Sequence, residues 1–415
     1  MAPARLSIIS ACRVATEMDQ LFERLKTPSD SKIVLMVLDG LGGFRTPQRG
    51  SELFEAKTPN LDRLAKEGSS GVHTVVAPGV TPGSGAGHLA LFGYDPLKWE
   101  LGRGALSAAG IGFDLQSGDV AARVNFCHLD DEGMVTDRRA GRLPTEENER
   151  LCLKIREKMD LGGVEFFLQT EKEHRALLVL RGEGLSPLIT DTDPQAIGVS
   201  PLAPAPIDDS AERTAACVRD FLDQAKRVLQ GEKANFLLLR GFDTLPDLPS
   251  FNQRYGLNGI GIASYPMYRG IARIAGMQVP SSAAGLDGTL QALRESWPSY
   301  DFMFVHHKAT DSAGEDGDFD RKVAAIEEVD AMMPEVMKLQ PDVICVTGDH
   351  STPSQMMEHS WHQVAFVMWG SRIPTDSVET FNEEAARLGG FGSVMAKDLM
   401  PHMLAAAGRL MKFGA

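Results

Sequence analysis

One serine is flanked by glycines in a way that would let a phosphoryl group approach the main chain. Ser84 lies between Gly83 and Gly85, and an apolar run begins at Leu89. Glycine permits close approach of a ligand to the backbone, and a serine that opens a helix lies beside free N–H groups that attract phosphate. Its hydroxyl is a weak nucleophile unless a base or a metal ion lowers its pKa. By itself the stretch is more simply explained as a glycine-rich turn with a serine cap, so a catalytic role needs support from elsewhere in the chain.

Carboxylates and histidines that could supply this support follow three apolar segments, within residues 32–40, 301–308 and 342–350. They are Asp39, Asp311, Glu315, Asp349, His350 and, further along, His359. An open α/β sheet places its sites beyond the carboxyl ends of its strands. Oxygen and nitrogen ligands of this kind suit Mn, Mg or Zn, and no thiol is placed to join them.

A single acid after a strand is as often an N-cap or a turn former as a ligand. Three strands that each end in acids or histidines, together with Ser84, are harder to explain in that way. Two metal ions can clamp the attacking and leaving oxygens in phosphoryl transfer. The pattern therefore predicts a two-metal site.

The elements that would position these residues point to an α/β fold. The three apolar segments are continuous, as expected of parallel strands buried on both faces. A helix is predicted after Thr58, with Pro59 in its first turn and Gly68 at its end. A strand over residues 72–76 would lead to the serine, and a helix over residues 393–410 would cover the sheet. Residues 102–104 are interpreted as a tight turn carrying Arg103, either a phosphate contact or a solvated surface arginine.

A second domain is predicted where the pattern changes near residue 118. Short alternating strands are expected at residues 120–126, 134–136, 166–168 and 175–181, followed by a helix that begins near residue 209 and ends before Gly231. We interpret residues 118–247 as an α+β cap domain inserted into a core made of residues 32–117 and 248–415. A length of 415 residues agrees with two domains.

Charge and composition narrow the classes of partner. The formal net charge of -14 argues against nucleic acid or an anionic membrane, so a small anionic substrate would need a local basic pocket. No apolar run approaches the ~20 residues of a membrane span. Five unclustered cysteines indicate reduced thiols and a cytoplasmic location. Residues 1–31 do not resemble a signal peptide; we interpret them as a helical extension that packs on the core or contacts a second copy in a homo-oligomer.

Several stretches resemble a known family. Those around Asp39, Thr58 to Asp62, Ser84 and Gly348 to Ser351 resemble the alkaline phosphatase superfamily. More narrowly, residues 83–96, 137–142, 173–176 and 308–311 resemble the archaeal-type cofactor-independent (2,3-bisphosphoglycerate-independent) phosphoglycerate mutases. The resemblance runs from Lys32 to the C-terminus. It implies an alkaline phosphatase-like fold with an inserted cap.

The resemblance also implies an activity, the interconversion of 3-phosphoglycerate and 2-phosphoglycerate in glycolysis and gluconeogenesis. In this reading Ser84 is the nucleophile and forms a phosphoserine. Asp39, Ser84, Asp349 and His350 would hold one divalent ion, and Asp311, Glu315 and His359 the other. Mn or Mg is favoured, with Zn or Co as alternatives.

Further roles are carried over by the same resemblance. The substrate grip would consist of Arg138, Arg139, Arg142, Arg175, Arg181 and His88. Forked guanidinium groups bind carboxylate and phosphate bidentately, although a charged, solvated strand face would look the same in sequence. Asp137 would be an acid or base for the glycerate hydroxyls, and Arg269 a cation near the nucleophile.

One predicted ligand departs from the family. The family has histidine where this chain has Glu315, and a glutamate adds negative charge and favours harder cations. The segment after His359 also differs, and His307 or His362 could compensate. Two alternatives therefore stay open. One is a phosphatase, phosphodiesterase or phosphonate hydrolase of the same superfamily, which would release free phosphate. The other is a non-catalytic binding protein, which metal analysis would reveal.

Overall fold

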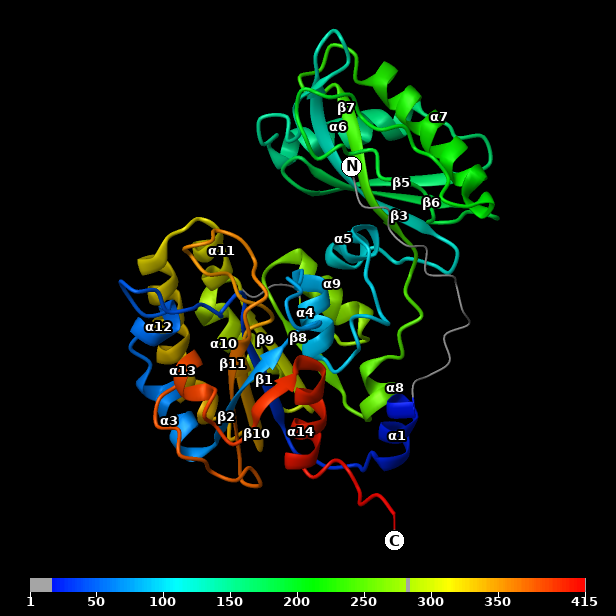
Figure 1. The fold of residues 1–415 in the computed structure, drawn as a ribbon. Helices are drawn as coiled ribbons and strands as arrows, with labels where there is room; N and C mark the ends of the chain where they lie inside the picture. Colours follow the sequence, from blue (N-terminus) through cyan, green and yellow to red (C-terminus); the bar gives the residue numbers. More distant parts are fainter. Residues whose placement is uncertain (1–16, 281–283, 415) are drawn as a thin grey trace. The chain divides into compact units, whose positions relative to one another are not determined.

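The computed structural model describes residues 17–280 and 284–414. These residues form two compact units, which Figure 1 shows in ribbon form. One unit is Leu101–Asp247, and the other contains the described residues up to Glu100 and those from Leu248 onward. None of the described helices combines the length and the apolar character that crossing a membrane requires.

The larger unit is built on a seven-stranded sheet in the order β12-β2-β11-β10-β1-β9-β8. Strand β11 is antiparallel to both of its neighbours, and the other adjacent pairs are parallel. Every side chain of β1 and β10 is buried, as the continuous apolar runs predicted. The strands are β1 Ile33–Leu38, β2 Ser69–Thr74, β8 Gly259–Ile262, β9 Phe302–His307, β10 Val343–Thr347, β11 Val364–Gly370 and β12 Gly392–Met395.

Helices cover both faces of this sheet. In Figure 1, α3 and α12 lie on one side of it and α4, α8 and α14 on the other. The helices of this unit are α1 Glu17–Leu25, α2 Glu52–Glu55, α3 Pro59–Glu67, α4 Ser84–Leu91, α8 Phe251–Tyr255, α9 Pro266–Ile274, α10 Gly285–Ser296, α11 Ala309–Glu315, α12 Phe319–Met337, α13 Glu383–Ala386 and α14 Leu399–Ala406. The predicted fold class, a mostly parallel sheet between helices with an α+β insertion, is confirmed.

The smaller unit is an antiparallel sheet between helices. Its strands follow the order β4-β3-β6-β5, and β7 pairs with β3. Helices α6 and α7 pack on one face, where Val124 and Phe126 join their core, and α5 packs on the other, against Ala121. The elements are α5 Arg103–Ile111, β3 Val120–Leu129, β4 Val135–Asp137, α6 Thr145–Lys158, β5 Glu165–Lys172, β6 Arg175–Arg181, the 3₁₀ turn Asp209–Ala211, α7 Glu212–Val228 and β7 Phe236–Asp243.

The structure corrects several predicted elements. Residues 102–104 open helix α5 rather than forming a tight turn. Because α5 packs on β3 and β7, the smaller unit begins at Leu101 and not at residue 118. A β-carbon on Gly104 would lie 2.1 Å from the carbonyl oxygen of Ala121, so glycine permits this close packing.

Other differences concern the boundaries of elements and elements that were not predicted. Residues 392–395 form strand β12, paired with β2, and the final helix begins only at Leu399. Strand β2 begins at Ser69, before the predicted start. Thr58 precedes α3 as predicted, but its side chain makes no capping hydrogen bond. Helix α6 and strand β7 were not predicted.

Candidate active site

Three adjacent strands bring the predicted ligands to one edge of the large sheet. Strand β1 lies between β9 and β10 and is parallel to both, so their carboxyl ends meet. Asp39 follows β1, Asp349 and His350 follow β10, and Asp311 lies in the first turn of α11 after β9. All four side chains are buried.

The buried side chains form two overlapping groups that could hold metal ions. Asp39, Asp349 and His350 make the first group, and Asp311, His350 and His359 the second, with the ligand atoms of each group within 4.8 Å of one another. In the first group, Nε2 of His350 lies 3.3 Å from Oδ1 of Asp39 and 3.2 Å from Oδ2 of Asp349. In the second, Nε2 of His359 lies 3.6 Å from Oδ1 of Asp311.

The unpaired carboxylate oxygens and the neutral imidazole of these groups suit a divalent cation. Oδ1 of Asp39 and Oδ2 of Asp349 are buried and have no hydrogen-bond partner among the described residues, and such orphaned oxygens are costly unless a cation binds them. Burial outweighs the attraction of Asp349 and Asp39 and lowers the pKa of His350 to about 4, so its ring is neutral at pH 7. A neutral imidazole is the form that binds metal.

Ser84 is placed beside the first group at the start of a helix. It is the first residue of α4, and its Oγ lies 3.2 Å from Nε2 of His350. Gly87 allows this approach, because a β-carbon there would lie 2.5 Å from the carbonyl oxygen of Asp349. The hydroxyl therefore lies beside the first group.

His88 takes a different position from the substrate contact predicted for it. It is fully buried, and its Nδ1 lies 2.8 Å from the carbonyl oxygen of Ser84 and 3.1 Å from Oδ2 of Asp349. Its ring packs against Tyr268 at a centroid distance of 4.8 Å. The hydrogen bond to the carbonyl oxygen of Ser84 supports the backbone of the serine turn.

Lys308 is a residue of the site that the sequence analysis did not assign. Its Nζ lies 3.1 Å from Oδ2 of Asp39, donates to Oδ2 of Asp311 and donates to the hydroxyl of Tyr268 at 2.9 Å. Burial opposes its charge, but Asp39 and Asp311 outweigh burial, so the pKa of Lys308 is raised. The ammonium thereby neutralises carboxylates of both groups.

Tyr268, which the sequence analysis did not assign, reaches the site from α9. Its ring stacks on His306 at 3.8 Å, and His306 in turn hydrogen bonds to Oδ2 of Asp39 at 3.2 Å. Arg269 is the next residue of the helix, and its pKa is lowered by burial and by repulsion from Arg273. A hydrophobic run that ends in two histidines and a lysine could have indicated His306 and Lys308.

Glu315 lies at the rim of the second group. It is the last residue of α11, its side chain is 54% exposed, and its Oε1 lies 3.9 Å from Nε2 of His359. Burial and repulsion from Asp311 raise its pKa. His359 is oriented by the hydrogen bond that its Nδ1 donates to the carbonyl oxygen of Pro82 at 3.1 Å, which leaves its Nε2 free to bind a cation.

The two histidines considered as substitutes belong to neither group. His362 is stacked between Phe44 and Trp361, at centroid distances of 4.7 and 4.9 Å. His307 follows His306, and burial lowers its pKa to about 4.

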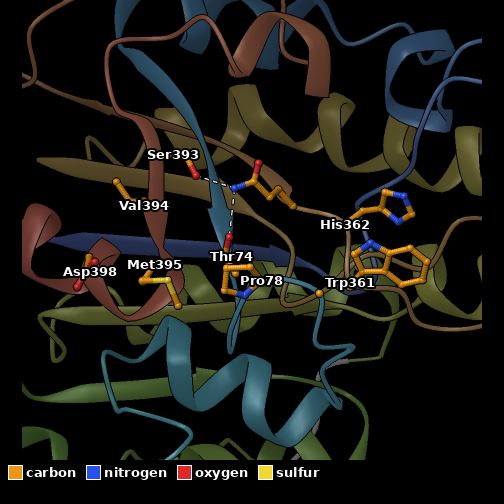
Figure 2. A pocket seen from close by; sticks show the side chains of 10 residues that line it. Thr74, Pro78, Trp361, His362, Ser393, Val394, Met395 and Asp398 are labelled. Carbon is orange, nitrogen blue, oxygen red and sulfur yellow. Dashed lines mark hydrogen bonds between the residues drawn. The ribbon is translucent and has the colours of Figure 1, made fainter.

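His362 also lines a separate cavity of about 620 Å³. Figure 2 shows this cavity, with dashed hydrogen bonds at Thr74 and Ser393 that Gln363 donates. No residue of the two metal groups lines it.

In the smaller unit, a cluster of arginines differs in part from the predicted substrate grip. Arg123 on β3 pairs in register with Arg240 on β7, and both lie near Arg103 of α5. Partial burial and repulsion from Arg240, Arg123 and Arg175 lower the pKa of Arg103 to about 10. Cations that repel one another in this way favour a bound anion, although Arg123 also pairs with Glu171, whose Oε1 lies 3.2 Å from its guanidinium. In the sequence, the cluster could have been recognised from Arg123, a single charged residue among the apolar residues at the start of β3.

The other predicted arginines are placed less uniformly. Arg138 makes a bidentate pair with the buried Asp193, with distances of 3.0 and 2.7 Å, and Arg240 lies 3.6 Å from the same carboxylate. Arg181 instead donates hydrogen bonds to Asp119 at 2.8 and 2.7 Å, and it is not part of the arginine cluster. Arg175 is paired in register with Asn125.

Asp137 organises the turn that carries the remaining two arginines. Its carboxylate accepts hydrogen bonds from the backbone N–H groups of Arg139 at 2.8 Å and Gly141 at 2.6 Å. Arg139 and Arg142 are exposed on this turn, and Arg142 adopts a positive φ of 55°. These contacts give Asp137 a structural role in addition to the acid–base role predicted for it.

Comparison with known proteins agrees with this geometry. The chain matches the family model described as 2,3-bisphosphoglycerate-independent phosphoglycerate mutase over residues 65–235. A Thermus thermophilus protein named "Probable 2,3-bisphosphoglycerate-independent phosphoglycerate mutase" is 50% identical over 396 residues, which cover 94% of this chain and 97% of that protein.

Two solved structures are also similar over nearly the whole chain. A protein from Pyrococcus horikoshii superposes with a TM-score of 0.80 at 29% identity, covering 94% of this chain and 100% of that one. A cofactor-independent phosphoglycerate mutase from Thermoplasma acidophilum gives a TM-score of 0.70 at 31% identity, covering 91% and 100%. The resemblance predicted from the sequence motifs is thus confirmed, and the chain belongs to the 2,3-bisphosphoglycerate-independent phosphoglycerate mutases.

Proposed function

We propose that the protein interconverts 3-phosphoglycerate and 2-phosphoglycerate without a bisphosphoglycerate cofactor, through a phosphoserine at Ser84. The observation that carries the proposal is the position of Ser84 Oγ, 3.2 Å from Nε2 of His350 and at the first residue of a helix. Free N–H groups at a helix start attract a phosphoryl group. Membership of the family supplies the substrate.

In this proposal the two buried groups hold two divalent ions. Asp39, Asp349, His350 and Ser84 would bind one ion, and Asp311 and His359, with Glu315 at the rim, would bind the other. When bound, the ions lower the pKa of the serine hydroxyl and neutralise the oxygens of the transferred phosphoryl group. The preponderance of carboxylates favours Mn or Mg, with Zn and Co as alternatives.

The chain's own residues then carry the transfer. Ser84 Oγ loses its proton and attacks phosphorus, and the bond to the glycerate oxygen breaks as that oxygen takes up a proton. The glycerate stays bound and reorients. Its second hydroxyl loses a proton and attacks the phosphoserine, which restores the Ser84 hydroxyl. The ammonium of Lys308, bonded to Asp39 and Asp311, is close enough to these carboxylates to limit the repulsion between them.

The smaller unit would supply the binding of the substrate anion. We assign this role first to Arg103, Arg123 and Arg240, with Arg138 and Arg175 beside them, because their charges act on one another. Arg139 and Arg142, exposed on the adjoining turn, stay candidates for it. The four described cysteines are free thiols, which suits the cytoplasmic location that we propose.

Replacing Arg103 by methionine is expected to raise the KM for 3-phosphoglycerate by about 10- to 150-fold, the cost of one charge-assisted hydrogen bond. The affinity for Mn²⁺ should not change. Arg181→Met is the matched control, since that arginine is held by Asp119 outside the cluster. Steady-state kinetics of both variants would decide the matter, and an equal effect of the two substitutions would contradict this assignment of the substrate grip.

Glu315→His is expected to shift the metal preference of the second group from Mn or Mg toward Zn or Co, because imidazole is a softer ligand than carboxylate. Glu315→Gln should lower the affinity of the second group for its ion. The measurement is elemental analysis with activity in each metal, and Glu358→Gln, an exposed acid next to His359, is the control. If both Glu315 variants retain the wild-type metal content and preference, Glu315 is not a ligand.

An enolase-coupled assay tests the proposed function. With 3-phosphoglycerate and Mn²⁺ or Mg²⁺, the protein should generate 2-phosphoglycerate, which enolase converts to an absorbing product. Inorganic phosphate measured in the same reaction should stay at background. Stoichiometric release of phosphate without isomerisation would instead identify a phosphatase.

A further inference from the structure

Thr352 joins the two metal groups although it belongs to neither. It follows His350 by two positions and is fully buried. Its Oγ1 donates to Oδ1 of Asp311 at 2.6 Å and lies 3.0 Å from Nδ1 of His350. One hydroxyl therefore contacts a carboxylate of the second group and the imidazole that both groups share.

The direction of these two hydrogen bonds follows from the chemistry of the partners. An ionised carboxylate only accepts, so the single proton of the Thr352 hydroxyl points to Asp311. The oxygen of the hydroxyl then accepts from N–H at Nδ1 of His350. A histidine protonated at Nδ1 has its lone pair at Nε2, the nitrogen that faces Asp39, Asp349 and Ser84. The same hydroxyl thus selects the metal-binding tautomer of His350 and fixes the orientation of Asp311.

The backbone of Thr352 is held as firmly as its side chain. Its N–H lies 3.2 Å from the carbonyl oxygens of both Gly40 and Gly42. Its carbonyl oxygen accepts a hydrogen bond of 2.8 Å from Nζ of Lys322, which also donates to the carbonyl of Gly42 at 3.1 Å. A β-carbon on Gly314 would lie 2.3 Å from the carbonyl oxygen of Thr352, so α11 packs directly against it.

Lys322 is fully buried, and burial lowers its pKa although two buried acids favour its charged form. Glu52 and Glu383 attract its ammonium. Glu52 accepts from the N–H of Ser354 at 2.7 Å, and Glu383 accepts from the N–H of Gly43 at 2.9 Å. The loops after β1 and β10, which carry the ligands of the first group, are therefore fastened to a common charged cluster.

We propose that Thr352 is a positioning residue that couples the two metal groups, and that Lys322 fixes the loop from which it acts. The proposal rests on the proposed function to the extent that both groups bind divalent ions. Hydrogen bonds behind metal ligands orient them, and losing one costs about 10- to 100-fold in metal affinity. Because Thr352 contacts Asp311 and His350 together, its hydroxyl should support the binding of both ions.

The test is calorimetric titration of the metal-free protein with Mn²⁺ alone. Thr352→Val, which keeps the shape and removes the hydroxyl, should weaken Mn²⁺ binding about 10- to 100-fold in both groups. Thr352→Ser should restore binding close to the wild-type value. Thr214→Val, a buried threonine of the other unit, controls for the loss of a buried hydroxyl, and metal-free thermal unfolding controls for folding. Wild-type affinity in a folded Thr352→Val variant would overturn the proposal, as would a wild-type protein that binds no Mn²⁺.

A second measurement needs no substitution of Thr352. In Mg²⁺-loaded wild-type protein labelled with ¹⁵N at histidine, the His350 ring should show a slowly exchanging proton at Nδ1, assigned by its loss in His350→Gln. An unprotonated or rapidly exchanging Nδ1 would overturn the proposal. If Mn²⁺ binds and depends on Thr352 while 3-phosphoglycerate is not isomerised, the proposed function fails and the role of Thr352 stands.

Discussion

Ser84→Ala is expected to lower kcat by about 10⁶-fold, the order of magnitude lost when the serine nucleophile of a protease is removed. The hydroxyl lies beside His350, at the first residue of α4, where the proposed mechanism needs its nucleophile. Binding of Mn²⁺ should fall only modestly, since Asp39, Asp349 and His350 remain. Thermal unfolding should be close to that of the wild type, because one small polar group contributes little to stability.

The control for this prediction is Ser393→Ala, which removes a hydroxyl from β12 that bonds only to Gln363 in the described hydrogen-bond network. Its kcat should be unchanged. Measurement of kcat and KM for both variants with 3-phosphoglycerate is sufficient. Wild-type turnover by Ser84→Ala would rule out the phosphoserine route.

His359→Ala is expected to remove one of the two ions and to lower kcat about 10³-fold, since one ion contributes several kcal/mol of charge stabilisation in phosphoryl transfer. The first group should stay intact, because His359 belongs only to the second. Metal content per chain should therefore fall from two ions to one, by elemental analysis after dialysis against Mn²⁺.

His362→Ala is the matched control for His359. It lies three positions further along the same segment, but its ring is stacked between Phe44 and Trp361. Both ions and most of the activity should persist in this variant. If His359→Ala keeps two ions and full activity while the protein is folded, the second group does not bind a metal as we have assigned it.

The sequence predicts the large unit well because its strands carry local signals. Continuous apolar runs such as residues 33–38 can hardly be anything but buried strands, and an acid at the end of each is placed by the parallel pairing itself. For that reason Asp39, Asp311, Asp349 and His350 could be brought together in advance. Thr58 and Pro59 likewise give the start of α3 without knowledge of the fold.

The features that the sequence did not predict depend on contacts between distant segments. Residues 392–395 form a strand only because they pair with β2. The sequence alone does not show this pairing, and it therefore predicts a helix over residues 393–410. Helix α5 belongs to the smaller unit because Gly104 meets Ala121, a contact that no local pattern reveals. Arg123 and Arg240 meet across β3 and β7, and β7 was not predicted. In the sequence Lys308 is an ordinary lysine after a strand. Its role in the site becomes visible only in the fold, where its ammonium contacts Asp39 and Asp311.

The most direct test of the central claim is to follow the phosphoryl group itself. Wild-type protein loaded with Mn²⁺ should be mixed with 3-phosphoglycerate labelled with ³²P, quenched at short times and separated into protein, phosphoglycerates and phosphate. Our account predicts transient label on the peptide containing Ser84, then label in 2-phosphoglycerate, with none in free phosphate. Isomerised product without labelled protein, or label that ends in free phosphate, would contradict it.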